Sequence, residues 1–162
     1  MVKWLLTFSS LLFFLNSCEK STPLSKYQSS NEFVFIDVVE KRIIKTNNFQ
    51  SIYSDKIQKA LDKWFDNSLK TKGFDGVLEI RVLNLTSEEI AINNSVKIKV
   101  FIKIEFSIFK SVLNTKNIIV ISGDEYGHLN GYFTISDKFT EVDNIIKKLI
   151  EKLSIELTNE LT

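Results

Sequence analysis

The chain has 162 residues, with 21 Lys and Arg against 20 Asp and Glu, which gives a formal net charge of +1. Hydrophobic residues make up 44% of it, with 13 Phe but a single Pro and five Gly. Such a chain has enough apolar side chains for one folded domain. Its balanced charge excludes an extended nucleic-acid groove and a strongly basic membrane patch.

The first 17 residues have the pattern of a secretory signal peptide. Lys3 supplies a positive start, an apolar run extends from Trp4 to Leu15, and the small residue Ser17 precedes Cys18. The run is shorter than the roughly 20 apolar residues that span a bilayer. We therefore expect removal of residues 1–17. Because Lys3 is the one charge that leaves with them, the mature chain is formally neutral.

The junction Leu15-Asn16-Ser17-Cys18 resembles the bacterial lipoprotein signal. The resemblance implies that Cys18 is acylated through its sulfur and becomes the new N-terminus, anchored in a membrane by its acyl chains. Cys18 is the one cysteine of the chain, and acylation accounts for an unpaired thiol in an exported protein. Glu19 is not the aspartate that this family associates with inner-membrane retention, so the resemblance favours the outer membrane. The alternative is an ordinary signal peptide with Cys18 present by chance.

The mature chain begins with a polar stretch and continues into a strand. Residues 18–32 contain Pro23 and several serines, which predicts a flexible, lipid-anchored tether. Residues 33–162 are expected to form a single periplasmic domain. Its first segment, 33–44, is rich in aromatic and β-branched residues and predicts a strand.

A helix is predicted next, from Ser51 or Ser54, with Ser54 as its N-terminal cap and Gly73 as its stop. Apolar residues at spacings of three and four form one stripe. The stripe comprises Ile57, Ala60, Leu61, Trp64, Phe65 and Leu69.

Three further strands are predicted, at 77–85, 96–109 and 117–122, with a connection at 88–95. The middle one alternates strictly between apolar and polar residues over most of its length, which indicates a sheet with one buried face and one wetter face. The segment 123–136 fits either a bulged continuation of the last strand or a loop.

A long amphipathic helix over 137–161 ends the chain. The order strand, helix, strand, strand, strand, helix predicts an α+β two-layer sandwich. In it, two helices cover one face of a four-stranded, largely antiparallel sheet.

Motifs for catalysis are absent from the sequence. There is one histidine, His128, with no GxSxG elbow, no zinc-spaced Cys and His pairs and no phosphate loop. Asp124, Glu125 and His128 could hold a metal, but structural sites usually need a fuller ligand set, so a polar, glycine-punctuated turn or bulge is the favoured explanation. We expect no enzymatic activity, no metal and no cofactor.

Two sets of residues are candidates for binding. Two aromatics, Phe101 and Phe109, interrupt the polar side of the 96–109 strand. Paired aromatics on a wet face can mark a docking surface, and the alternative is that the tether or a loop covers them. With them lie Lys97, Lys99 and Lys103, which complete a candidate partner-contact face. Trp64, Phe65 and Phe106 could instead line a ligand pocket between helices and sheet, or simply belong to the core.

Residues 50–162 are similar in pattern to a group of alphaproteobacterial lipoproteins of uncharacterised function. The pattern comprises KALDKWFDNSLKTKGFDGVLEIRVLNLTSEE, VKIKVFIKIEF and IIKKLIEKLSIELTNEL. The topology also resembles the lipopolysaccharide-assembly lipoprotein and related envelope auxiliary lipoproteins, although Glu19-Lys20-Ser21 replaces the usual glycine and aromatic residue after the cysteine.

These resemblances imply a lipid-anchored periplasmic interaction module, a non-enzymatic accessory in envelope assembly or transport with an envelope protein as partner. The alternative is a carrier of a small apolar ligand or lipid.

Overall fold

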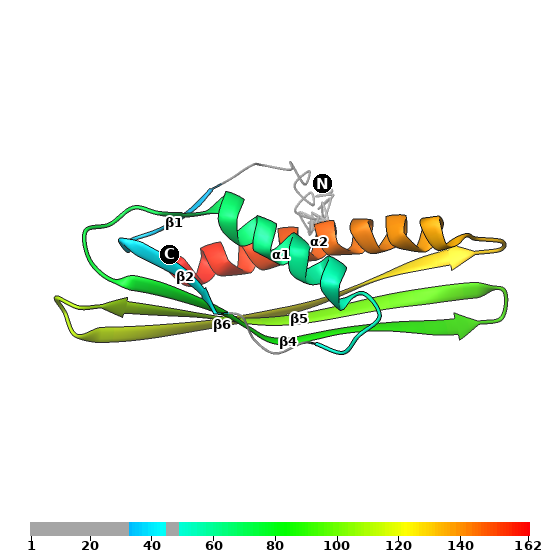
Figure 1. Cartoon of the computed structure of the whole chain (residues 1–162), viewed down its shortest axis with the longest axis horizontal. Coiled ribbons are helices and arrows are strands. Elements are labelled where there is room, and N and C mark those ends of the chain that lie inside the picture. Colours follow the sequence, from blue (N-terminus) through cyan, green and yellow to red (C-terminus); the bar gives the residue numbers. More distant parts are fainter. Residues whose placement is uncertain (1–32, 45–48) are drawn as a thin grey trace, which may run out of the picture.

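The computed structural model describes residues 33–44 and 49–162, so the predicted signal peptide, Cys18 and the tether lie outside the described residues. Figure 1 shows the arrangement of the elements. In chain order these are β1 (Val34–Ile36), β2 (Glu40–Ile44), α1 (Ser54–Ser68), β3 (Leu69–Thr71), β4 (Val77–Ile92), β5 (Ser95–Lys110), β6 (Thr115–Asn130) and α2 (Ile135–Leu161).

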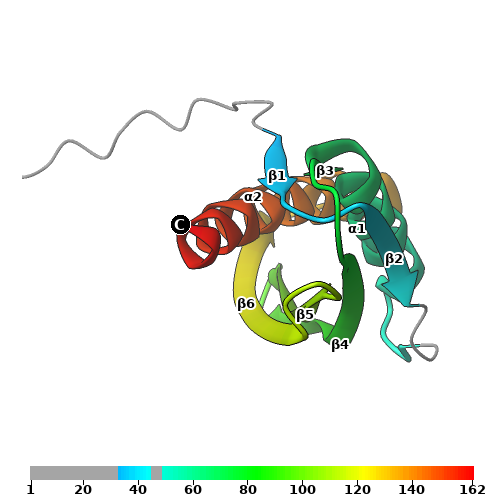
Figure 2. The same cartoon turned by 90° about the vertical axis from the view of Figure 1, so that its left-hand side faces the viewer.

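The main sheet has four strands in the order β2-β4-β5-β6, and both helices cover the same face of it (Figure 1). Viewed end-on, β4, β5 and β6 form a strongly curved layer beneath the helices (Figure 2). The predicted α+β two-layer architecture is therefore confirmed. Its polarity is mixed, because β2 runs parallel to β4 whereas the other two pairs are antiparallel.

The predicted first strand, 33–44, is in fact two strands in two sheets. β1 pairs in parallel with β3 in a small separate sheet, and β2 joins the edge of the main sheet. Between them, the N–H groups of Val39 and Glu40 both donate to the carbonyl of Gly76, while Val38 is fully buried. The alternation of apolar residues continues through residues 37–39, which is why the sequence pattern did not show that the strand is divided there.

The first helix differs from its prediction at both ends. Tyr53, not Ser54, is the N-cap, and no side chain caps it. At the other end the helix stops at Ser68 instead of near Gly73, because Leu69 takes an extended conformation and starts β3. Pairing of β3 with β1 and burial of Leu69, which is 1% exposed, outweigh the helical spacing of that leucine.

The second long strand extends further than predicted. β4 runs to Ile92, so the predicted connection at 88–95 is mostly strand, and the turn itself is only Asn93-Asn94. Asn93 has φ of 51°, a conformation that asparagine tolerates better than most residues. A register shift between Val82 and Asn84 inserts one extra residue, and this bulge hides the alternation from sequence analysis.

The ambiguous segment after residue 122 is strand as far as Asn130. Gly123 and Gly127 lie on the face of β6 that α2 covers, and a Cβ atom at Gly127 would stand 1.9 Å from Glu141 Oε1. At Gly123 it would stand 2.9 Å from a methyl group of Leu149. The two glycines therefore let α2 lie directly on the backbone of β6.

The last helix begins at Ile135, two residues before the predicted start. Thr134 and Asp137 form a reciprocal capping box, in which the Asp137 N–H donates to Thr134 Oγ1 and the Thr134 N–H donates to Asp137. The buried stripe of α2 packs on the sheet as predicted. It consists of Val142, Ile145, Ile146, Leu149, Leu153 and Leu157.

Candidate functional site

The face of the main sheet turned away from the helices, called here the outer face, carries all five residues of the predicted contact surface. Along β5, buried residues such as Ile98, Val100 and Ile102 point toward the helices. The intervening positions therefore point outward, and they include Phe101 and Phe109. Lys97, Lys99 and Lys103 occupy outward positions on the same strand.

Phe101 and Phe109 do not form one aromatic patch. They lie eight positions apart, which corresponds to about 26 Å along an extended strand. Phe101 lies between Thr86 and Asp124 in the register, whereas Phe109 lies beside Lys116, whose Nζ stands 5.0 Å from the ring centroid. Both rings are half-buried, so each provides a separate apolar contact point.

Two of the three lysines of the outer face have close neighbours, one of them a carboxylate and the other an aromatic ring. Lys99 Nζ lies 3.4 Å from Asp124 Oδ2, and Lys97 Nζ lies 4.3 Å from the centroid of the Tyr126 ring. Lys103 is exposed. The outer face is thus a surface of mixed charge with aromatic points, which resembles the polar-and-aromatic composition of protein interfaces.

Strand β6 adds apolar residues to the outer face that sequence analysis missed. Ile118, Val120 and Tyr126 are 52%, 44% and 51% exposed, at positions facing the same side as Phe101. Ile118 and Val120 lie within the predicted strand 117–122 and Tyr126 lies beyond it, but the face of each residue depends on the register with β5. Residues 118–121 are all apolar, so the sequence holds no alternation there that separates outward from inward side chains.

The second candidate set, Trp64, Phe65 and Phe106, lies in the core. Phe65 and Phe106 are fully buried and meet edge to face, with ring centroids 6.4 Å apart. Trp64 is 5% exposed and packs on Phe65 at 5.2 Å. A pocket of about 290 Å³ lies elsewhere, at the end of the sheet between the Asn93-Asn94 turn and residues 131–133.

The cluster Asp124, Glu125 and His128 is divided between the two faces of the sheet. Asp124 and His128 point outward, whereas Glu125 points toward α2 and pairs with Lys152. Within residues 33–44 and 49–162, no group of three or more potential metal ligands lies together. Alternation along β6 separates residues that are neighbours in sequence.

A polar triad links three elements at the end of the sheet where both helices start. Tyr53 Oη donates to Glu89 Oε1, and Lys138 Nζ donates to Glu89 Oε2 at 2.6 Å. Two hydrogen bonds lower the pKa of Glu89 below its usual 4.5, and the one from Lys138 contributes more than the one from Tyr53. Burial, together with the neighbouring Glu89 carboxylate, raises the pKa of Tyr53. The triad fixes α1, β4 and α2 to one another.

We call the end of the sheet that holds this triad the helix-start end. It includes residues 88–95 and 131–139.

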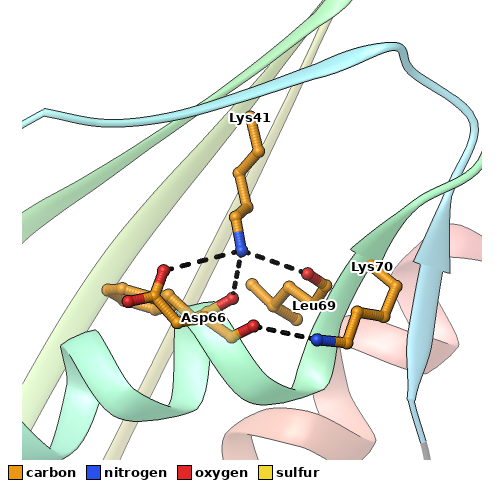
Figure 3. Close-up of polar contacts among 5 residues, drawn as sticks. Lys41, Asp66, Leu69 and Lys70 are labelled. Atoms are coloured by element: carbon orange, nitrogen blue, oxygen red, sulfur yellow. Dashed lines mark hydrogen bonds and ion pairs between the residues drawn. The ribbon is translucent and has the colours of Figure 1, made fainter.

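The C-terminus of α1 is capped by a lysine from another element (Figure 3). Lys41 Nζ, from β2, donates to the carbonyl oxygens of Phe65 at 2.6 Å and Leu69 at 3.2 Å, and it stands 3.8 Å from Asp66 Oδ1. The last turn of α1 contains no basic residue of its own. Lys41 therefore supplies two hydrogen bonds and a cation at the negative end of the helix dipole, and Lys70 of β3 adds a hydrogen bond to the carbonyl of Asp66 at 3.1 Å. Burial lowers the pKa of Lys41 below its usual 10.5.

At the opposite end of the sheet, three connections lie together: residues 37–39, 72–76 and 110–116. We call them the hairpin end. Lys110 Nζ lies 2.6 Å from Asp37 Oδ2, and the N–H of Val112 donates to Asp75 Oδ2 at 2.8 Å. Their apolar tips, Phe74, Val112 and Leu113, are 104%, 82% and 70% exposed. Sequence analysis placed residues 37–39 in a strand and used Gly73 only as a helix stop, although an apolar residue inside GFDG and SVLN is a detectable signal.

Among the described residues, no helix is both long enough and apolar enough to span a bilayer. α2, with 27 residues, carries charged residues along much of its length.

The chain matches no protein-family model and no curated protein sequence. It is similar to a solved minor lipoprotein of Acinetobacter baumannii, at 13% identity and a TM-score of 0.43, over 80% of this chain and 92% of that one. A hypothetical protein of Chlamydia trachomatis is similar at 10% identity and a TM-score of 0.40, over 76% and 97%. A protein of Xanthomonas campestris is similar at 7% identity and a TM-score of 0.38, over 82% and 91%. Likenesses of this size assign neither a family nor a function.

Proposed function

We propose that the chain is a lipid-anchored, non-enzymatic interaction module of the bacterial envelope. Cys18 would be its acylation site, and the outer face of the sheet its contact surface for an envelope protein. The domain would face the periplasm, with its anchor in the outer membrane. The N-terminal sequence supports the anchor, through the resemblance of residues 15–18 to a lipoprotein signal.

The geometry of the outer face is the observation that carries the contact function. Long strands hold Phe101, Phe109 and Tyr126 on one rigid surface that no described element covers, with lysines and carboxylates between them. Aromatic side chains on a rigid support bind a partner with little loss of conformational freedom, and surrounding charges select the partner's orientation. The buried packing of Phe65 and Phe106 gives no comparable support to the carrier function.

The anchor is tested by expressing the full chain and a Cys18→Ala variant in a bacterial host, followed by fractionation and intact mass. We expect the wild type to lose residues 1–17, gain acyl mass and enter the membrane fraction. The variant should remain unprocessed and unacylated. Identical cleavage of both into protein without acyl mass would contradict the proposal.

The contact face is tested by in vivo crosslinking from the acylated protein. Phe101→Ser and Phe109→Ser should each reduce the yield of the main crosslinked envelope partner. Tyr132→Ser, at an aromatic that is 109% exposed but lies at the helix-start end, is the matched control and should leave the yield unchanged. Unaltered partners in the two Phe variants would show that the outer face is not the contact surface.

A further inference from the structure

We propose that the hairpin end rests on the lipid surface that holds the anchor, with Phe74, Val112 and Leu113 inserted among the lipid headgroups. The proposal rests on acylation at Cys18. It adds an orientation, in which the long axis of the sheet stands away from the bilayer and the helix-start end is the distal end.

The position at which the folded domain begins favours the hairpin end over the helix-start end as the membrane contact. The 14 residues 19–32 separate Cys18 from Phe33. A flexible chain of that length has an end-to-end distance of about 20 Å on average, and its fully extended limit is about 50 Å. β1 follows Phe33 directly and leads into Asp37, about 13 Å further at strand spacing. The chain therefore enters the fold close to the hairpin end.

The helix-start end lies at the other end of 16-residue strands, a length of about 53 Å. It also exposes apolar residues, Tyr132 at 109% and Ile135 at 74%. The average reach of the tether, however, is well below the length of the sheet. With Cys18 in the bilayer, the hairpin end is the apolar surface that meets the lipid.

The apolar tips of the hairpin end are held outward by structured backbone. A Cβ atom at Gly73 would stand 2.6 Å from Asp37 Oδ1, and Gly76 has φ of 97°, so the loop that carries Phe74 is closely fitted to its neighbours. The Asp75 carboxylate joins that loop to Val112. Because these contacts fix the loops, insertion of the three tips requires no refolding.

The charges around the tips suit an anionic lipid surface. Three lysines, Lys72, Lys110 and Lys116, and two aspartates, Asp37 and Asp75, belong to the three connections. Asp37 is paired with Lys110, and Asp75 accepts from a backbone N–H, so the three connections keep a net charge of about +1 from Lys72 and Lys116 against Asp75. Basic residues that flank exposed apolar side chains are the arrangement by which peripheral proteins bind anionic membranes.

The test places a fluorescent probe at each end of the full-length, acylated protein. When Cys18 carries lipid, a cysteine introduced by Leu113→Cys is the one free thiol of the chain. Asn94→Cys, in the turn of the helix-start end, is the matched control. Both variants are labelled with an environment-sensitive dye and reconstituted in vesicles of equal parts phosphatidylethanolamine and phosphatidylglycerol that contain spin-labelled lipid.

We expect the lipid spin label to quench the dye at residue 113 but not at residue 94. In the Leu113→Cys background, Phe74→Ser with Val112→Ser should reduce the quenching to the level at residue 94. Equal quenching at both sites would mean that the domain lies flat, and no quenching at either would mean that it stands clear of the bilayer. A dye at residue 113 that is shielded from an aqueous quencher but not reached by the lipid label would indicate a protein occupant. Each of these three results overturns the proposal.

Intact mass separates this proposal from the one on which it rests. Protein that carries acyl mass but shows no quenching at residue 113 contradicts the docking alone. Protein that gains no acyl mass contradicts the anchor and the docking together.

Discussion

The hairpin end and the helix-start end lie at opposite ends of the same sheet, and different kinds of contact stabilise them. At the hairpin end, glycines and backbone contacts hold the connections, and apolar tips remain in solvent. At the helix-start end, side chains from three elements converge on Glu89, and Thr134 caps α2. The membrane contact proposed for the hairpin end needs fixed loops with exposed apolar tips. A surface that joins two helices to a sheet needs converging polar side chains. The following predictions test this difference, starting with the largest expected effect.

Glycine substitution should separate the two ends most clearly. Gly76 and Gly131 both have positive φ, but a Cβ atom at Gly76 would stand 2.2 Å from the carbonyl oxygen of Phe109, whereas nothing lies within 4 Å of one at Gly131. We expect Gly76→Ala to lower the free energy of unfolding by about 3 kcal/mol or more, and Gly131→Ala by about 1 kcal/mol. Urea unfolding of the two variants measures the difference, and equal losses would contradict the close approach at the hairpin end.

Removal of the lysine cap on α1 should have the next largest effect. Lys41→Met keeps the aliphatic stem but leaves the carbonyls of Phe65 and Leu69 without their donor, at a cost of about 1–3 kcal/mol. Lys59→Met, at an exposed position on the same helix, is the control and should change stability by less than about 0.5 kcal/mol. Thermal and urea unfolding report both values. Similar behaviour of the two variants would mean that the Lys41 contacts contribute nothing.

The triad at the helix-start end should make stability depend on pH. The pKa of Glu89 is lower in the folded state than its usual 4.5, so its contribution is present above that pH and is lost as the pH falls through the folded-state pKa. Glu89→Gln should lower the free energy of unfolding by about 1–2 kcal/mol at neutral pH. The difference from wild type should shrink at pH values well below 4.5. Glu88→Gln, an exposed neighbour on the outer face, should shift neither value, and a pH-independent deficit in Glu89→Gln would refute the assignment.

Polar substitutions of the hairpin tips should have the smallest effect on stability. Phe74 and Leu113 are exposed, so Phe74→Ser and Leu113→Ser should each change the free energy of unfolding by less than about 0.5 kcal/mol. Tyr132→Ser at the helix-start end should behave in the same way. Any loss of membrane contact in the tip variants then reflects the surface and not the fold, whereas a large drop in melting temperature would show that the tips are structural.

Most of the architecture was predictable because local patterns and tertiary packing agree. Strict alternation in β5 and the long apolar stripe of α2 indicated the correct element and the correct buried face in both cases. The errors arose where non-local contacts decide the conformation. Leu69 continues a helical stripe but pairs with Val34, and a bulge near Leu83 interrupts the alternation of β4.

The candidate surfaces were only partly predictable for the same reason. Phe101 and Phe109 were assigned to one face, because alternation within one strand determines faces. Their wide separation and their neighbours on β4 and β6 depend on register. The Tyr53, Glu89 and Lys138 triad joins residues that are distant in sequence, and the hairpin end joins three separate connections. No local pattern reports such juxtapositions.

The parallel pairing of β2 with β4 has a consequence for how the chain acquires its fold. The strands from β4 to β6 and helix α2 follow one another through short connections, so their contacts can form early and locally. Glu40, however, pairs with Val77, which lies 37 positions later, and the whole of α1 lies between them. The Lys41 cap on α1 likewise requires β2 to be in place. During synthesis from the N-terminus, the earliest strands therefore emerge before their partners. We expect the C-terminal hairpins and α2 to form first, and β1 and β2 to complete the domain last.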